Sequence, residues 1–313
     1  MVNRLTFLFI LLLLPAGFQA TAAADEETPW AVELQVKRYI GSHTSYEFGN
    51  PFPPCQAPLS RLEFPIDTWW SGGKLTGRFP RISLGVEIMR NINRDSDGAF
   101  TDSDWDDDDA PQVKTIYSVA ECRMEPSYII CGNVDLKIAD WVGLPAWFDL
   151  RPVAGIRWQR FELITHDGEE FFPLQESIPG EGIHFTQTYR QYFLGLKTEY
   201  DLERHFKTVP LTLLCQIDWA YVEGDNSDHH LLRVGNRWTY EKTHGEAWHV
   251  SVGARTNLTK NVNATVEAEY LRITTHGSHR LTNEVFDIDI GVDHGVKVYS
   301  EQKNIMFSLE YLF

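Results

Sequence analysis

The sequence predicts an all-β fold: a ten-stranded antiparallel transmembrane β-barrel of the outer-membrane type, with long extracellular loops. Three observations predict it. Many segments alternate apolar and polar residues with a period of two, as strands with one apolar and one polar face do. The last such segment ends on a terminal aromatic residue, Phe313. The N-terminus has the features of a secretory signal, and 13% of all residues are aromatic.

Residues 1–24 are expected to form a signal peptide, which leaves residues 25–313 as one barrel domain. Arg4 supplies the positive charge, Leu5–Leu14 the apolar stretch, and Ala20–Ala24 the small residues of a cleavage site. The apolar stretch is too short for a membrane-spanning helix. We therefore expect the mature protein to work outside the cytoplasm.

The alternation is clearest at the C-terminus, where odd positions from Ile305 to Phe313 are apolar or aromatic. The even positions from Ser300 to Leu312 are polar except for Met306 and Leu312. Residues 82–88, 248–255 and 264–270 alternate in the same way. In a membrane barrel the apolar side chains face lipid and the polar ones face the interior, whereas a soluble sandwich buries its apolar face in a core. The signal peptide, the terminal aromatic residue and the aromatic content favour the barrel.

The mature chain divides into ten expected strands, with room for membrane strands of about 9–11 residues. They lie near 30–46, 57–71, 80–92, 127–141, 147–165, 184–201, 209–224, 232–257, 262–276 and 297–313. Short turns follow the even-numbered strands, at Val142–Ala146, Leu202–Thr208 and Leu258–Asn261. Long loops follow odd-numbered strands, at Asn93–Pro126, His166–Ile183 and Gly277–Val296. This alternation places the long loops together on the outer side.

The formal net charge is −16, which excludes a nucleic-acid partner, since that requires a basic face. Much of the charge lies in Asp95–Asp109, and an acidic outer mouth attracts cationic ligands and peptides. Most of these aspartates are interpreted as a solvated charge run. A calcium site is the alternative for Asp95 and Asp97, which precede Gly98, but the segment does not match the helix–loop–helix pattern. We expect no metal site and no cofactor.

The chain has four cysteines, Cys55, Cys122, Cys131 and Cys215, in a compartment that permits disulfides. Cys215 has the parity of a lipid-facing residue and is expected to be free. Pairing among the other three is left open, with Cys122–Cys131 favoured because they flank Pro126 in one return of the chain. The sequence has no CxxC or HExxH motif of the kind that redox or zinc sites use.

The candidate catalytic pair follows the strand Leu211–Tyr221, whose odd positions are mostly apolar. Carrying its parity forward puts Asp228 and His230 on the polar side, pointing the same way. A carboxylate beside an imidazole fixes the tautomer of the ring and stabilises its charged form, so the ring can take a proton from water. A solvated polar hairpin tip is the alternative reading.

Three segments, Leu59–Phe64, Thr101–Trp105 and Asp225–His230, carry a resemblance to a known family. In these segments the sequence resembles the omptins, ten-stranded outer-membrane endopeptidases of Gram-negative bacteria. Leu59–Phe64 resembles the start of their second strand. Thr101–Trp105 resembles their Asp-x-Asp-Trp segment in the second extracellular loop, and Asp225–His230 their Asp-x-His segment in the fourth. The strand from Gly195 and the closing strand also follow the family's layout. The resemblance covers the mature chain as patches between divergent loops.

The resemblance implies an endopeptidase that needs no cofactor and works as a monomer, with its active site facing the exterior. Asp228 and His230 would be the dyad that activates water. Asp102 and Asp104 would lie across the cleft and help to hold or polarise the water and the scissile peptide. Two neighbouring carboxylates can share a proton because their repulsion raises one pKa.

The sequence departs from the family at its acidic substrate pocket, which selects basic residues. The aligned positions hold Ser45 and Asn226, so Glu47 and Asp225 are the nearest candidates for substrate binding. Omptins also bind lipopolysaccharide through basic residues on the outer wall. Arg160 matches one of these positions, whereas Thr188 and Gly245 replace two others. Outer-membrane lipid and lipopolysaccharide are the expected partners besides peptide substrates.

A catalytically inactive barrel of the same fold, serving as a small porin or adhesin, is the alternative function. Ten strands leave a lumen that side chains fill. Four charged residues have inward parity and could form a network across it: Arg255, Glu267, Glu269 and Glu310. The two hypotheses differ in geometry, because a protease requires the two aspartates, Asp228 and His230 to face one another across a cleft.

Overall fold

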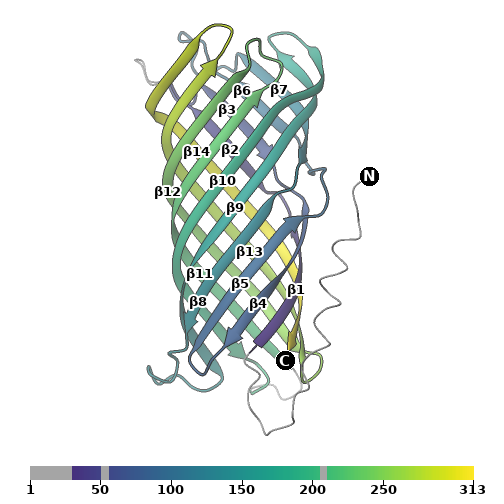
Figure 1. Ribbon diagram of the computed structural model, residues 1–313, viewed down its shortest axis with the longest axis vertical. Helices are drawn as coiled ribbons and strands as arrows, with labels where there is room; N and C mark the ends of the chain where they lie inside the picture. Colours follow the sequence, from purple (N-terminus) through teal and green to yellow (C-terminus); the bar gives the residue numbers. More distant parts are fainter. Residues whose placement is uncertain (1–29, 51–55, 205–209) are drawn as a thin grey trace.

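The computed structural model describes residues 30–50, 56–204 and 210–313, so the expected signal peptide lies outside the described residues. These residues form fourteen antiparallel strands (Figure 1). The strands are β1 (Trp30–Tyr39), β2 (His43–Phe48), β3 (Ser60–Pro65), β4 (Trp69–Arg78), β5 (Ile82–Asn91), β6 (Phe100–Asp104), β7 (Ile116–Met124), β8 (Tyr128–Leu136), β9 (Phe148–Phe172), β10 (Glu176–Asp201), β11 (Leu211–His230), β12 (Arg237–Asn257), β13 (Val262–Asn283) and β14 (Ile288–Leu312). None of the described residues forms a helix long and apolar enough to cross a membrane.

The strands close into a barrel at two levels. In the lower half, the order β1-β4-β5-β8-β9-β10-β11-β12-β13-β14 closes through β1 and β14. In the upper half, β9 to β14 continue and are joined by β2, β3, β6 and β7, with β7 pairing back onto β9. Ten strands therefore surround the barrel at both levels, which confirms the predicted ten-stranded fold. The first four barrel strands are each split into two segments.

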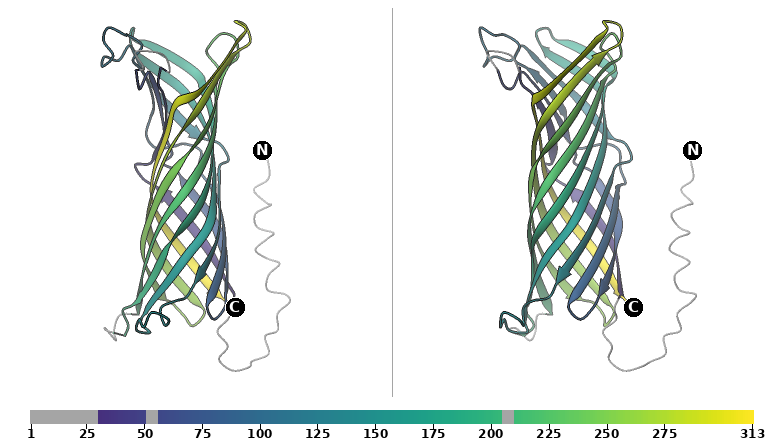
Figure 2. Two further views of the ribbon diagram at one scale, coloured as in Figure 1. Left: turned by 90° about the vertical axis from the view of Figure 1, so that its left-hand side faces the viewer. Right: turned by 60° about the vertical axis from the view of Figure 1, so that its left-hand side comes forward.

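The strands extend further above the apolar belt than the sequence indicates. The expected loop His166–Ile183 is mostly the paired ends of β9 and β10, and Gly277–Val296 is mostly the ends of β13 and β14. The expected loop Asn93–Pro126 contains β6 and β7. These three loop predictions were wrong because both faces of a strand become polar above the belt, and the period-two pattern fades. The extended ends separate into two branches at the rim (Figure 2).

An apolar belt surrounds the lower half of the barrel. Its exposed side chains come from every lower strand and include Leu34, Leu84, Ile130, Ile156, Leu194, Ile217, Val250, Val266 and Phe307. On six strands an outward-facing basic residue lies two positions above the uppermost apolar or aromatic residue of the belt. These residues are Arg38, Arg90, Arg160, Arg190, Arg272 and Lys303. We call these six residues the basic ring. This order of apolar belt and basic boundary fits a membrane barrel.

The interior of the lower half holds a polar cavity of ≈ 640 Å³. The four residues predicted to face inward, Arg255, Glu267, Glu269 and Glu310, all line it. Ion pairs cross this space, among them Lys37 with Glu269 at 2.7 Å. Above the cavity, a buried cluster that includes Tyr39, Trp70, Phe161, Tyr189 and Phe193 fills the barrel. Side chains thus occupy the lumen between the cavity and the rim.

The favoured disulfide between Cys122 and Cys131 is absent, and both residues are free thiols. Cys122 lies opposite Thr165 on β9, whereas Cys131 lies opposite Arg157. Eight residues along one strand separate these levels by about 27 Å, far beyond disulfide geometry. The predicted pairing was wrong because Cys122 lies on β7 and Cys131 on β8, and the chain between them is extended and does not turn back. Cys215 is exposed and free, as expected, and Cys55 lies outside the described residues.

Candidate active site

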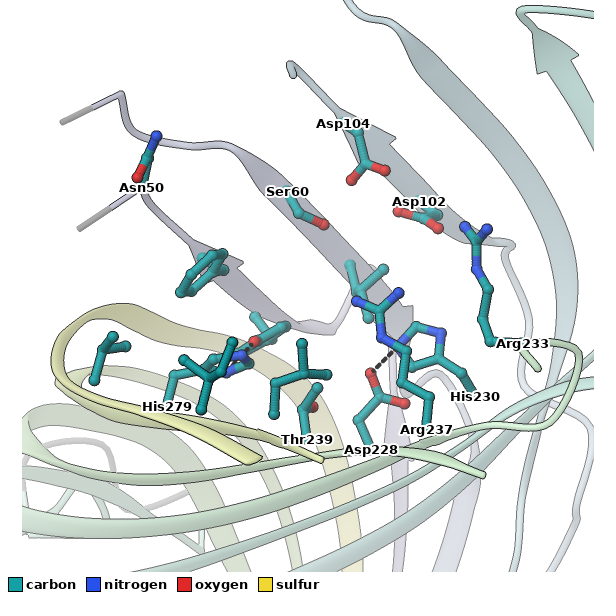
Figure 3. Close-up of a pocket in the computed structure, with 16 residues that line it drawn as sticks. Asn50, Ser60, Asp102, Asp104, Asp228, His230, Arg233, Arg237, Thr239 and His279 are labelled. Atoms are coloured by element: carbon teal, nitrogen blue, oxygen red, sulfur yellow. Dashed lines mark hydrogen bonds and ion pairs between the residues drawn. The ribbon is translucent and has the colours of Figure 1, made fainter. Parts of the chain in front are cut away.

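A cleft of ≈ 300 Å³ opens between the two walls of the upper barrel. Strands β2, β3 and β6 form one wall, and β11 to β14 form the other (Figure 3). Its lining residues are Tyr46, Phe48, Asn50, Ser60, Leu62, Asp102, Asp104, Asp228, His230, Arg233, Arg237, Thr239, His279, Leu281, Ile290 and Val292. The cleft thus contains all four residues that the sequence predicts to be catalytic.

The two predicted pairs reach the cleft from opposite walls. Asp102 and Asp104 lie two residues apart on β6, so both side chains point to the same face of their strand. Asp228 and His230 have the same spacing at the upper end of β11. In Figure 3 the aspartate pair lies on one wall, and Asp228 and His230 lie across from it. This arrangement meets the geometric requirement of the protease hypothesis.

Asp228 and His230 form an ion pair. Nε2 of His230 lies 3.0 Å from Oδ2 of Asp228, whose side chain is only 1% exposed. Neither carboxylate oxygen of Asp228 has an aligned hydrogen bond to a described residue. A buried carboxylate at this distance stabilises positive charge on the ring, which the ring acquires when it takes a proton from water.

The Asp102 carboxyl group is partly protonated at neutral pH, because its pKa is raised. Burial raises the pKa of Asp102 to about 7, with a further contribution from the charge of Asp104. The positive charges of His230 and Arg233 lower this pKa, and Asp228 raises it. The charges on both walls therefore interact. Oδ1 of Asp102 and Oδ1 of Asp104 are buried without a hydrogen-bond partner among the described residues, which leaves both oxygens available to water or substrate.

Two arginines in the cleft were missed by the sequence analysis. Arg237 lies directly opposite His230 in the pairing of β11 with β12, and its Nε is buried without a partner in the described chain. Arg233 lies in the loop between these strands and lines the same cleft. No local pattern identifies them, because their position depends on the register in which β12 pairs with β11.

A second buried network under the cleft was also missed. Nδ1 of His279 lies 3.0 Å from Oε1 of Glu241 and 2.8 Å from the hydroxyl group of Tyr46. The Glu241 side chain is fully buried, and burial raises its pKa. Inward parity along β12 could have identified Glu241, whereas the bulge after Gly277 hides the parity of His279.

The two predicted substrate-binding residues lie outside the cleft. Glu47 forms ion pairs with Arg61 at 2.7 Å and Lys297 at 3.9 Å. Asp225 pairs with Arg190. Both residues have odd numbers on strands whose even-numbered neighbours face inward, so their parity turns them to the outer wall. The structure therefore places neither residue in the cleft. Arg160 lies on the outer wall, as expected for a lipid contact, where Glu162 accepts its hydrogen bond at 2.6 Å.

Comparison with known proteins identifies the family. The Omptin family pattern matches residues 68–301, which is most of the chain. The chain belongs to the omptin family. Its fold is similar to that of the outer membrane protease OmpT from Escherichia coli, with a TM-score of 0.80 and 16% sequence identity over 93% of this chain and 99% of that one. It is thus a barrel of the Gram-negative outer membrane, in a family of outer-membrane proteases.

More distant barrels resemble this omptin far less. The translocator domain of autotransporter NalP from Neisseria meningitidis gives a TM-score of 0.36 at 9% identity, covering 92% of this chain and 90% of that one. The outer membrane protein OprG from Pseudomonas aeruginosa gives 0.32 at 10% identity, covering 92% and 97%. A search of curated protein sequences gave no match.

Proposed function

We propose that this omptin is an endopeptidase that hydrolyses exposed peptide bonds with water activated by His230. The observation that carries the proposal is the convergence of Asp102, Asp104, Asp228 and His230 on one cleft from two walls. A peptide lying between the walls would have a base on one side and a proton-holding carboxyl group on the other. The apolar belt below the cleft would leave the active site facing the exterior.

In the proposed reaction His230 takes a proton from water, and the resulting hydroxide forms a bond to the scissile carbonyl carbon. Asp228 stabilises the imidazolium ring. The Asp102–Asp104 pair holds the water and the peptide in line. Arg237 supports the negative charge on the carbonyl oxygen, since its guanidinium group has an unpartnered donor beside the dyad. The peptide C–N bond then breaks as the imidazolium returns its proton to the leaving nitrogen.

Lipopolysaccharide is proposed as the lipid partner. Arg160 belongs to the basic ring, which lies at the level where lipid phosphate groups meet a barrel wall. Opposite Arg160 on β10 stands Thr188, which has no charge. Basic residues on neighbouring strands, including Arg190, supply charge near this position. No cofactor is part of the proposal.

The structure does not favour a porin as the alternative function, because the buried aromatic cluster between the lower cavity and the rim occupies the lumen. Among the described residues, no observation favours adhesion over hydrolysis.

The test uses the full mature chain refolded in detergent, with and without lipopolysaccharide. A mixed peptide library is incubated with the protein, and products are identified by mass spectrometry. We expect cleavage by the wild type and none by His230→Ala. Identical products from both proteins, each shown to be folded by heat-modifiable gel mobility, would contradict the proposal.

A further inference from the structure

The cleft has two chemically different ends, and strand register defines them. On one wall, cross-strand neighbours form a row from Asp228 through Thr239 and Leu281 to Ile290. On the facing wall, rows run from Asp102 through Leu62 to Tyr46, and from Asp104 through Ser60 to Phe48. Each wall therefore carries its charged residues at one end. At the other end most lining residues of both walls are apolar or aromatic, with Asn50 and His279 as the polar ones (Figure 3).

The apolar end lies close enough to the dyad to receive a neighbouring side chain of the substrate. Leu281 is two strands from Asp228, which corresponds to about 10 Å. An extended peptide covers that distance in about three residues. Phe48 faces this end from the opposite wall and packs on His279 with ring centroids 4.6 Å apart.

No carboxylate is available at the apolar end to bind a basic side chain. None of the described residues that line this end is acidic. Glu241 lies beneath the cleft, where its side chain is fully buried and one of its oxygens is paired with His279. Arg233 and Arg237 lie at the other end of the cleft together with Asp102, Asp104 and Asp228 (Figure 3), so no charged side chain of the described chain pairs with a substrate residue at the apolar end. Apolar side chains, in contrast, gain about 25 cal/mol per Å² of surface that they bury.

The wall of the apolar end is held in place by the Asn283 side chain and by a backbone hydrogen bond from the N–H group of Glu284 to the Gly235 carbonyl group at 2.9 Å. Asn283 donates a hydrogen bond through Nδ2 to the Val234 carbonyl group at 2.8 Å. Its Oδ1 accepts hydrogen bonds from the backbone N–H groups of Val285 at 3.1 Å and Phe286 at 3.2 Å. The two loop tips beside the apolar end are therefore tied together, so this surface is preorganised for a ligand.

We propose that this end of the cleft is a subsite for an apolar substrate side chain within about three residues of the scissile bond. Phe48, Leu281, Ile290 and Val292 form it. The inference rests on the proposed peptidase function and names its substrate class: extended peptides with Leu, Ile, Val, Phe or Met beside the cleavage point, and without a requirement for a basic residue.

The binding experiment uses full-length His230→Ala and two fluorescent peptides that differ only in carrying Leu or Lys at one position. We expect the Leu peptide to bind at least tenfold more tightly. Ile290→Asp should remove this preference, because it places a carboxylate in the subsite at an exposed position that tolerates substitution. Val285→Asp is the matched control, since Val285 is exposed on the loop tip and does not line the cleft.

Cleavage of a peptide library by the wild type separates the two hypotheses. Cuts that need His230 and cluster beside apolar residues support both. Cuts that need His230 but cluster at Lys or Arg overturn the apolar subsite and leave the peptidase standing. If no cut needs His230, the peptidase function fails, and the binding experiment still decides the subsite. Equal binding of the Leu and Lys peptides overturns it.

Discussion

Asp102 is the residue whose ionisation should set the alkaline limb of activity. Its pKa is raised to about 7, so the carboxyl group is protonated below that pH and gains a negative charge above it. A second charge in the aspartate pair would oppose the negative charge that develops on the carbonyl oxygen. We therefore expect kcat/KM to fall as pH rises through about 7.

Two substitutions should move this limb in opposite directions. Asp104→Asn removes a charge that raises the pKa of Asp102, so the limb should shift to lower pH even if the overall rate falls. Arg233→Gln removes a charge that lowers the same pKa, so its limb should shift to higher pH. pH profiles of both variants test this. A limb that stays in place in both would assign it to another group.

At the scale of single residues, the sequence predicts the catalytic side chains better than it predicts the other residues that line the cleft. Parity along one strand places Asp228 and His230 on the inward face, because strand alternation is a local property. Glu47 and Asp225 were mistaken for pocket residues since a shift of one residue turns a side chain to the other face. Arg237 and His279 reach the cleft only through pairing register, which no local pattern contains.

The tips of β11–β12 and β13–β14 act as one element through Asn283. Gly235 lies beside this asparagine with φ +95°, and a Cβ atom there would lie 2.0 Å from Oδ1 of Asn283. Gly235→Ala should therefore release the tips, at a cost of about 1–3 kcal/mol. We expect faster proteolysis at the tips and weaker binding of apolar peptides.

Gly291→Ala provides the control for this prediction. It lies on β14 near the same wall, and a Cβ atom there would meet nothing within 4 Å. Limited proteolysis of the folded barrels should leave this variant like the wild type. Equal cleavage of the two variants would show that the tips do not depend on Asn283.

Within the apolar belt, the expected strands agree closely with the observed ones. Above the belt, the expected strands end earlier than the observed strands do. Of the expected strand 297–313, residues 297–312 fall within β14, yet this strand begins at Ile288. Below the rim, lipid outside and a polar cavity inside impose strict alternation. Above it, water touches both faces, so polar residues satisfy both and the sequence loses its periodicity. The catalytic walls stand in this upper region.

For the whole barrel, stability should depend on buried ion pairs that cross the lumen. Lys37 and Glu269 lie 2.7 Å apart with side chains 6% and 15% exposed. Lys37→Met would leave Glu269 without its partner and should cost about 3–5 kcal/mol. The double variant Lys37→Met/Glu269→Gln should recover most of that loss. Urea unfolding of both variants in detergent measures the difference, and equal stability of the two would contradict this account.

The basic ring draws its residues from six strands around the barrel, and we expect lipopolysaccharide bound to it to stimulate the activity of the protein. Arg160→Ala should weaken the stimulation of activity by lipopolysaccharide while the folded fraction stays unchanged. Because the ring contains six cations, the loss should be partial. Activity titrated with lipopolysaccharide measures it. A titration curve identical to that of the wild type would remove Arg160 from the lipid site.

The most direct test of the central claim is the kcat/KM of His230→Ala and Asp228→Asn on one cleaved peptide. Both proteins must show the heat-modifiable mobility of the folded barrel. If His230 activates the water with support from Asp228, each substitution should lower kcat/KM by roughly 10²–10⁴-fold. His230→Ala with a kcat/KM within twofold of the wild type would contradict the account, because the water would then be activated by some other group.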